Sequence, residues 1–311
     1  MKNGLNIKQQ DISAAVFPGG RLATESSHLM DYWELTKPRL TFLVLITTLV
    51  GFCMGSSASL DWILLFHTMM GTALVAGGAA VLNQFLERDL DARMNRTENR
   101  PIPSGRLPAG DALLFGAVLS VAGLLYLVMA VNLLTSFLAA VTLGMYIFVY
   151  TPLKKKTPLC TIVGAFPGAT PPMIGWAAVS GTLDAGAWIL FAILFFWQMP
   201  HFYALAQMYR DDYARAGLPI LTVMDPDGFR TGMQIVSHTL LLLPASLAPA
   251  FFGMTGMLYF WVALFLSLGF LGFGLRAAFS RTLAGSKRLF LASIFYLPSL
   301  LILMVADKVA P

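Results

Sequence analysis

Three oxygen-bearing side chains recur at a helical interval in the first third of the chain. Asn83, Glu87 and Asp91 are each four residues apart, so an α-helix would place them in one row along a single face. The row would be about 12 Å long at 1.5 Å per residue. Magnesium favours such oxygen donors and commonly takes one or two carboxylates, completing its coordination with water and substrate phosphates. The spacing therefore predicts a Mg²⁺ site with these three residues as catalytic ligands.

Basic residues that suit a polyanion surround this row in the sequence. Guanidinium groups bind phosphate oxygens through forked hydrogen bonds, so carboxylates and arginines at one helix end indicate a metal–diphosphate site. A lysine run further along would either attract phosphate to the same place or only anchor the loop at the membrane. The carboxylate row itself also has an ordinary interpretation, as a solvated, salt-bridged helix end. The candidate diphosphate-binding residues are Arg93, Arg96, Arg100, Lys154, Lys155 and Lys156.

A second polar cluster follows a later apolar run. Asp211 and Asp212 would provide further metal ligands opposite the first row, with Asp212 as a catalytic residue. His201 precedes Asp212 by eleven residues, close to three helical turns, so an unbroken helix would place both on one face. Trp197 and Tyr150 are aromatic neighbours that would either pack in the core or stack on a large flat ligand.

Composition places these residues in a membrane protein. The chain has 311 residues, of which 57% are hydrophobic and only 12% charged, whereas soluble domains carry about 25% charged residues. This excludes a typical soluble enzyme, a disordered chain and a disulfide scaffold. The net charge of +5 does not indicate nucleic-acid binding, because no basic stripe lies on a soluble domain. Since a spanning helix needs about 20 apolar residues, we expect nine spans, at about 40–58, 63–86, 112–131, 133–151, 160–180, 187–209, 233–252, 257–275 and 289–306.

The basic residues predict the topology of this all-α integral membrane protein. Twenty of the 21 lysines and arginines lie before the first span or in alternate loops, and Lys308 is the exception. The positive-inside rule then predicts a cytoplasmic N-terminus and an external C-terminus. We expect residues 1–36 to form a cytoplasmic arm and residues 37–311 the transmembrane domain.

Several stretches together resemble the intramembrane (UbiA-type) prenyltransferases, in particular the branch that farnesylates haem. The chain departs from the wider superfamily at Glu87, where many relatives have Asp, and after Asp211-Asp212, where no acid follows until Asp225. The resemblance covers motifs from about residue 30 to 225. The matching stretches are Leu35–Arg39, Asn83-x3-Glu87-x3-Asp91, Met94-x-Arg96-Thr97-x2-Arg100-Pro101, Tyr150–Lys155, Trp197–Phe202 and Arg210–Pro219.

This resemblance implies a helix bundle around a central cavity in a bacterial cytoplasmic membrane, with its active site on the cytoplasmic side. It further implies Mg²⁺ as cofactor, farnesyl diphosphate and haem B as substrates, and haem O as product. His201, Trp197 and Tyr150 become candidate haem-binding residues. The product would pass to downstream haem-modifying or oxidase-assembly proteins, and no nucleic acid would be bound.

Three alternatives remain at this point. A sister prenyltransferase acting on a quinone precursor or chlorophyllide would share the fold and the diphosphate site. A transporter would place its acids near the bilayer midplane within internal repeats, whereas here they gather at one face. An electron-transfer haem protein would need paired axial histidines at matched depth, which His67 and His201 do not provide.

Overall fold

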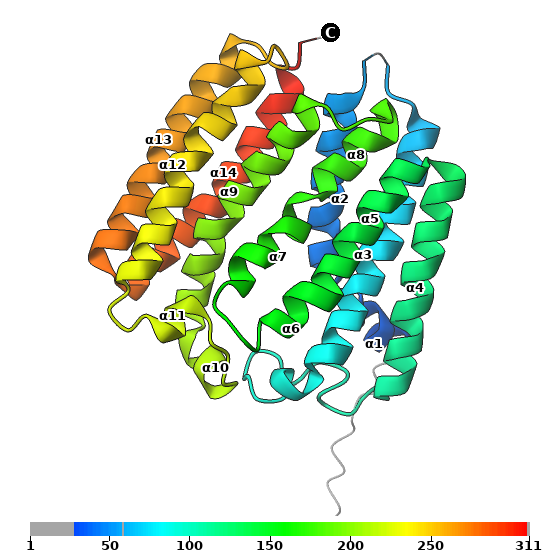
Figure 1. The fold of residues 1–311 in the computed structure, drawn as a ribbon, viewed down its shortest axis with the longest axis vertical. Coiled ribbons are helices and arrows are strands. Elements are labelled where there is room, and N and C mark those ends of the chain that lie inside the picture. The colour runs from blue at the N-terminus through cyan, green and yellow to red at the C-terminus, as the bar shows by residue number, and fades with distance from the viewer. Residues whose placement is uncertain (1–27, 58, 310–311) are drawn as a thin grey trace, which may run out of the picture.

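Nine helices long and apolar enough to cross a membrane run side by side in the computed structural model, which describes residues 28–57 and 59–309 (Figure 1). The expected all-α membrane bundle is therefore confirmed for these ranges. The spans are α2 (Pro38–Gly55), α3 (Trp62–Asp91), α4 (Ala109–Ala130), α5 to α6 (Leu133–Leu153), α7 to α8 (Cys160–Ser180), α9 (Ala185–Met208), α12 (Phe229–Phe251), α13 (Met257–Ser280) and α14 (Leu283–Ala306).

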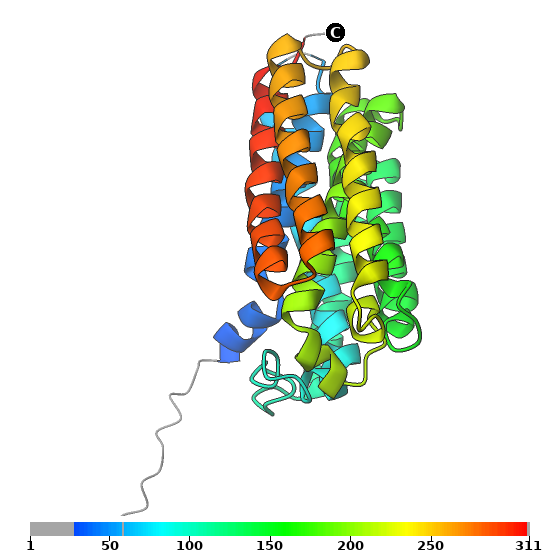
Figure 2. The same ribbon diagram turned by 90° about the vertical axis from the view of Figure 1, so that its left-hand side faces the viewer.

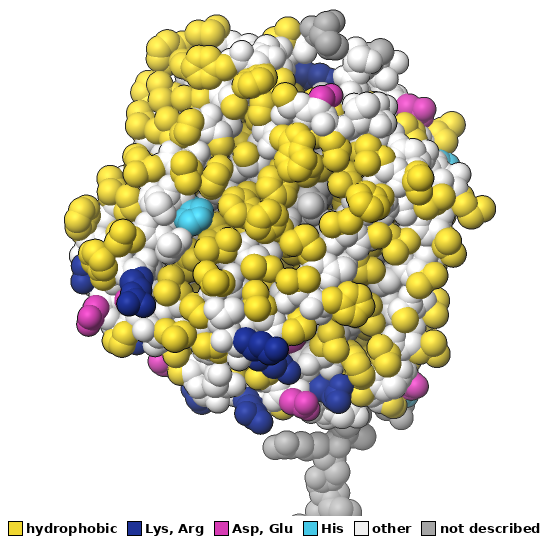
Figure 3. Space-filling model, viewed as in Figure 1, with side chains coloured by type: hydrophobic (Ala, Val, Ile, Leu, Met, Phe, Trp, Pro, Cys, Tyr) yellow, Lys and Arg dark blue, Asp and Glu magenta, His cyan; other side chains and the backbone are white. Residues whose placement is uncertain are grey.

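Most of the short helices and long connections between spans lie at one end of the bundle. Helix α1 (His28–Leu35), α10 (Arg210–Arg215) and α11 (Leu221–Met224) lie at one end, and the C-terminus lies at the other (Figures 1 and 2). We call the first the basic end, defined by α1 and by residues 92–108, 154–159, 209–228 and 281–282. In Figure 3, lysines and arginines gather mainly along this edge, while hydrophobic side chains cover most of the face above it. The grouping agrees with the predicted topology, and the cytoplasmic orientation stays a prediction.

Helix α3 is longer than its apolar run suggests. It continues through the polar residues to Asp91, thirty residues in all, and so carries the whole carboxylate row on one continuous helix. Asp61 begins it, since the side chain accepts hydrogen bonds from the backbone N–H groups of Ile63 and Leu64. The apolar run ends near residue 86, as expected, and the helix continues past it through the row, as the four-residue spacing predicted.

Two spans are interrupted where they approach the site. A π-helix (Met145–Tyr150) separates α5 (Leu133–Gly144) from α6 (Thr151–Leu153), and such widened turns often mark functional positions. The fifth span divides into α7 (Cys160–Ala169) and α8 (Pro171–Ser180). Pro171 has no N–H to offer the carbonyl of Pro167. The Thr170 hydroxyl donates to that carbonyl instead, at 2.9 Å.

Lys308, the exception to the charge sorting, has a structural partner at the end opposite the basic end. Its Nζ donates to the main-chain oxygens of Cys53, at 2.8 Å, and of Ser56. These carbonyls lie at the C-terminal end of α2, where a positive charge is favourable. Burial lowers the pKa of Lys308. This cation therefore ties the end of the chain to α2.

Glycines permit the closest helix contact in the bundle's interior. A Cβ on Gly175 of α8 would lie 1.9 Å from the carbonyl oxygen of Thr48, and one on Gly51 of α2 equally close to that of Pro172. Small residues at such crossings let helix backbones approach closely. In a membrane this matters because helices associate through van der Waals packing and not through the hydrophobic effect. Helices α2 and α8 thus meet backbone to backbone.

We expect Gly175→Ala to destabilise the protein by about 1–3 kcal/mol, because the added methyl group forces α2 and α8 apart. Gly144→Ala is the matched control, since a Cβ there meets nothing within 4 Å. Thermal unfolding in detergent, followed by circular dichroism, measures the difference. Equal midpoints for the two variants would contradict this account of the contact.

Candidate active site

The predicted row forms on α3 and is buried. Asn83, Glu87 and Asp91 are each at most 3% exposed. Asn83 donates from Nδ2 to the hydroxyl of Thr151 at 3.2 Å. Thr151 in turn donates to the carbonyl of Tyr146 across the π-helix, at 2.8 Å. The interruption of the fourth span thus brings its end against the first member of the row.

Glu87 is neutralised by the first lysine of the run. Lys154 Nζ lies 3.1 and 3.0 Å from the two carboxylate oxygens of Glu87. Burial by itself lowers the pKa of Lys154, but the adjoining Glu87 carboxylate outweighs it and raises the pKa above the usual value. Lys155 and Lys156 are exposed. The structure therefore separates one paired lysine, whose side chain is only 13% exposed, from two exposed lysines.

Asp91 is held by the loop that follows it. Arg100 donates from Nη1 to Asp91 Oδ2 at 2.7 Å, and the Thr97 hydroxyl donates to the main-chain oxygen of Asp91 at 2.9 Å. The loop consequently folds back over the end of α3. The other carboxylate oxygen, Oδ1, is buried and has no hydrogen-bond partner among the described residues. Leaving a buried anionic oxygen unpaired is costly, so this oxygen is suited to bind a cation.

The same loop, residues 92–108, is fixed at its outer side. Arg106 forms ion pairs with Asp31 and Glu34 of α1, the latter at 2.9 Å. The guanidinium of Arg96 lies over the ring of Tyr209, 4.8 Å from its centroid, within the range of a cation–π contact. Arg93 is exposed. The loop therefore connects α1, the carboxylate row and the end of α9.

Lys37 is a site residue that the spacing of the acids did not reveal. Its Nζ lies 3.4 Å from Asn83 Oδ1, and burial, followed by the charge of Arg100, lowers its pKa to about 8. Its backbone adopts the left-handed conformation (φ 49°, ψ 62°), which is uncommon for a residue other than glycine. The sequence signal was the Leu35–Arg39 stretch, which belongs to the family resemblance but did not by itself assign a role to Lys37.

The second acidic cluster is arranged differently from the prediction. Helix α9 ends at Met208, and Tyr209 departs from helical geometry (φ −111°, ψ 24°) before α10 begins. The expectation that His201 and Asp212 share one helical face was therefore wrong, because the helix between them is broken. Asp212 pairs with Arg215 on α10, and Asp211 is exposed.

The row has the oxygen chemistry for Mg²⁺, although it is not a ready-made metal cluster. Within residues 28–57 and 59–309, no group of three or more His, Cys, Asp or Glu residues is placed to hold a metal ion. Two carboxylates and one amide oxygen nevertheless match an ion that takes the rest of its coordination from water and phosphate. One of these carboxylate oxygens, Asp91 Oδ1, is unpaired among the described residues. The residues present fit the metal with Asn83, Glu87 and Asp91 as its holders.

The candidate haem residues belong to two separate packing groups. His201 stacks between Trp197 and Phe290, with centroid distances of 5.0 and 4.8 Å. Its Nδ1 is 2.7 Å from the hydroxyl of Ser293 on α14, which leaves Nε2 as the ring atom that could meet a ligand. Tyr150 instead stacks on Tyr146, with ring centroids 5.5 Å apart.

Comparison with known proteins agrees with this geometry. Residues 44–299 match the UbiA prenyltransferase family. The chain is 49% identical to protoheme IX farnesyltransferase from Solibacter usitatus (strain Ellin6076), covering 90% of this chain and 99% of that protein. It is 41% identical to the protein of that name from Aquifex aeolicus (strain VF5), covering 93% and 99%.

Solved structures show the same fold at much lower sequence identity. Digeranylgeranylglyceryl phosphate synthase superposes with a TM-score of 0.75 at 15% identity, covering 90% of this chain and 98% of that one. A UbiA homolog from Archaeoglobus fulgidus bound to GPP and Mg²⁺ gives a TM-score of 0.63 at 15% identity, covering 89% and 99%. The bundle is thus that of an intramembrane prenyltransferase. This chain belongs to the UbiA prenyltransferase family.

We expect Lys154→Met to reduce prenyl transfer at least tenfold, because it leaves the Glu87 carboxylate buried without its cation. Lys155→Met is the matched control, because it removes the same positive charge from the next residue, which is exposed. Turnover of both purified variants, with circular dichroism to confirm folding, measures the effect. If Lys155→Met lost as much activity as Lys154→Met, the buried pair would not be what matters.

Proposed function

We propose that this protein transfers a farnesyl group from farnesyl diphosphate to a vinyl group of haem B, with addition of water, giving haem O and diphosphate. The buried oxygen row with its unpaired Asp91 Oδ1 carries the diphosphate half of this proposal. The haem half is supported by the name shared by relatives 38–49% identical to the chain. That similarity favours haem over a quinone precursor or chlorophyllide as the acceptor.

Asn83, Glu87 and Asp91 would hold Mg²⁺, which when bound supplies charge neutralisation for a departing diphosphate. The side chains that now neutralise the carboxylates lie beside them: Lys154 within 3.1 Å of Glu87 and Arg100 within 2.7 Å of Asp91. With the carboxylates bound to metal, these cations would turn to the diphosphate oxygens. Lys37 would join them. Arg93, Arg96, Lys155 and Lys156 would draw the diphosphate from the water side.

The bond changes follow from the substrates. The allylic C–O bond of farnesyl diphosphate breaks, and the electron pair leaves with diphosphate. The haem vinyl group donates its π electrons to the allylic carbon, forming the new C–C bond. Water then adds to the resulting cation and loses a proton, giving the hydroxyethyl group. The protein must keep water away until that last step, and a site enclosed by membrane-spanning helices does so.

His201 is the proposed contact for haem, with Trp197 beside it. The hydrogen bond between Nδ1 and Ser293 fixes the orientation of the imidazole. Such a bond is expected of a histidine whose other nitrogen, Nε2, binds a ligand. Tyr150, stacked on Tyr146, would lie nearer to the prenyl group. Asp212, freed from Arg215, would complete a second metal site together with Asp211 if α10 moves toward α3 on substrate binding.

The site would face the cytoplasm of a bacterium, since it lies at the basic end of the bundle. Both substrates would enter at the level of the lipid headgroups, because each combines a long apolar part with anionic groups. The haem O product would leave for a haem-modifying enzyme or an oxidase-assembly protein in the same membrane.

We expect Asp91→Asn to reduce farnesyl transfer by at least 100-fold, because it removes a buried anionic metal ligand while keeping the side-chain shape. Asp89→Asn is the matched control, since the Asp89 side chain is 78% exposed and only two residues away. The assay incubates purified protein with haem B, farnesyl diphosphate and Mg²⁺ and detects farnesylated haem by mass spectrometry. Near-normal activity of a folded Asp91→Asn variant would exclude the metal role, and no farnesylated haem from the wild type would exclude the function.

We expect His201→Ala to weaken haem B binding at least tenfold and to leave farnesyl diphosphate binding unchanged. Haem affinity is measured by titration, followed by the Soret absorbance of haem. Farnesyl diphosphate affinity is measured separately by equilibrium binding. His238→Ala is the control, because that imidazole already bonds the carbonyl of Gln234 on its own helix, at 2.7 Å. Equal haem affinity in the wild type and both variants would remove His201 from the proposal.

A further inference from the structure

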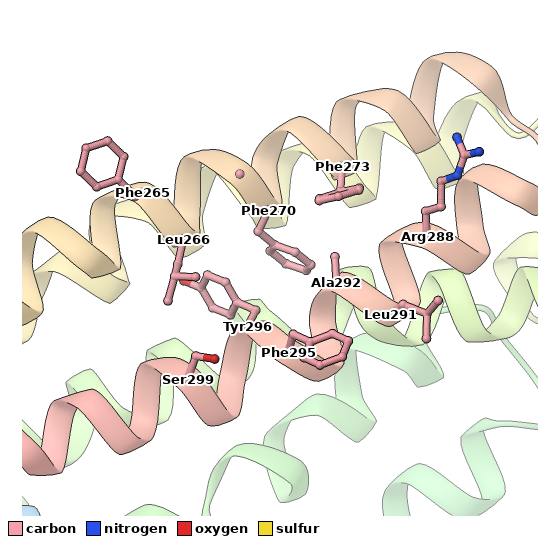
Figure 4. A pocket seen from close by; sticks show the side chains of 11 residues that line it. Phe265, Leu266, Phe270, Phe273, Arg288, Leu291, Ala292, Phe295, Tyr296 and Ser299 are labelled. Carbon is pink, nitrogen blue, oxygen red and sulfur yellow. The ribbon is translucent and has the colours of Figure 1, made fainter.

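A groove of about 480 Å³ runs between α13 and α14 on the outer surface of the bundle (Figure 4). The groove opens where α13 has Gly269, which has no side chain to fill the space. Phe265, Gly269 and Phe273 follow one another at four-residue intervals along the wall, and a Cβ on Gly269 would meet nothing within 4 Å. Phe270 and Tyr296, both at most 3% exposed, form the floor. The volume lies within the range of small-molecule sites, roughly 300–1,000 Å³.

The groove is apolar along its length and basic at one end. Phe265 and Phe295 are 69% and 72% exposed, as expected of side chains that face lipid tails. Arg288 lies at the end nearer the loop between α13 and α14, away from Phe265 and Ser299 (Figure 4). Among the described residues it has no ion pair or side-chain hydrogen bond. An unpaired arginine at the mouth of an apolar groove favours an amphiphile with an anionic head.

The positive charge of the surrounding segment also favours an anionic ligand. Residues 228–306 contain five basic residues and no acidic one, so they carry a charge of +5, which equals the net charge of the whole chain. Four of the five lie where α13 ends and α14 begins: Arg276, Arg281, Lys287 and Arg288. The rest of the chain has 16 basic and 16 acidic residues and is neutral. Four of these positive charges therefore lie on, or directly between, the two helices that form the groove.

We propose that this groove binds one anionic phospholipid, with an acyl chain between Phe265 and Phe273 and the headgroup phosphate on Arg288. Basic pockets between helices on the cytoplasmic side are suited to anionic headgroups, because lysine and arginine attract the negative charge of the lipid surface. The lipid would cover Tyr296, whose hydroxyl joins three helices by bonding Ser246 at 2.7 Å and Ser267 at 2.8 Å. Its binding would thus stabilise the contact of α12, α13 and α14.

The headgroup is tested by native mass spectrometry of the full-length protein after exchange into phosphatidylglycerol or phosphatidylcholine. We expect the wild type to retain one phosphatidylglycerol at least fivefold more tightly than phosphatidylcholine. Arg288→Gln should remove this preference. Arg230→Gln should keep it, since Arg230 is an exposed arginine near the same end of the bundle that does not line the groove.

The acyl chain is tested by filling the groove. Gly269→Leu adds a side chain into open space and should lower phosphatidylglycerol retention at least fivefold without unfolding the protein. Gly272→Leu is its control, because a Cβ there also meets nothing within 4 Å but Gly272 does not line the groove.

Three results would overturn the proposal. They are equal retention of the two lipids by the wild type, equal retention by Gly269→Leu and Gly272→Leu, and displacement of the bound lipid by farnesyl diphosphate at equimolar concentration. The last would make the groove a prenyl diphosphate site. Unchanged farnesyl transfer in the Gly269→Leu variant would show that the groove is separate from the active site, as we propose.

Discussion

The basic end of this protein depends on keeping two carboxylates buried at the edge of a membrane. Glu87 and Asp91 lie on α3 with at most 3% exposure, and isolated buried charges of this kind are strongly unfavourable. Each is therefore matched by a cation from a different segment, Lys154 from the loop after α6 and Arg100 from the loop after α3. The requirement for neutralisation brings these separate parts of the chain to one place.

Several irregular features follow from that requirement. The π-helix carries Thr151 to Asn83 and Lys154 to Glu87. The loop after α3 folds back so that Arg100 reaches Asp91, and Arg106 ties its outer side to α1. Lys37 adopts a left-handed backbone conformation beside the same row. Strained and widened backbone at one location is expected where function, not stability, fixes the geometry.

Much of this arrangement could be predicted from the sequence. Apolar length fixes the nine spans, and four-residue spacing fixes the row on α3, because both depend only on local helix geometry. The pairing of Glu87 with Lys154, and not with Lys155 or Lys156, could not be predicted, since it depends on how two distant helices approach. The break at Tyr209 was also missed: no proline or glycine marks it, so an unbroken helix from His201 to Asp212 was the simpler expectation. Lys37 belongs to a stretch that the sequence analysis named, but its place in the site could not be predicted because it depends on a contact 46 residues away.

The central claim is that the carboxylates exchange their cations for Mg²⁺ when farnesyl diphosphate binds. The most direct test is the affinity for farnesyl diphosphate as Mg²⁺ is varied, measured by equilibrium binding to the wild type and to a Glu87→Gln/Asp91→Asn double variant. We expect wild-type affinity to rise at least tenfold with Mg²⁺, and the double variant to show no such rise. Wild-type binding that is equally tight with and without Mg²⁺ would contradict the account.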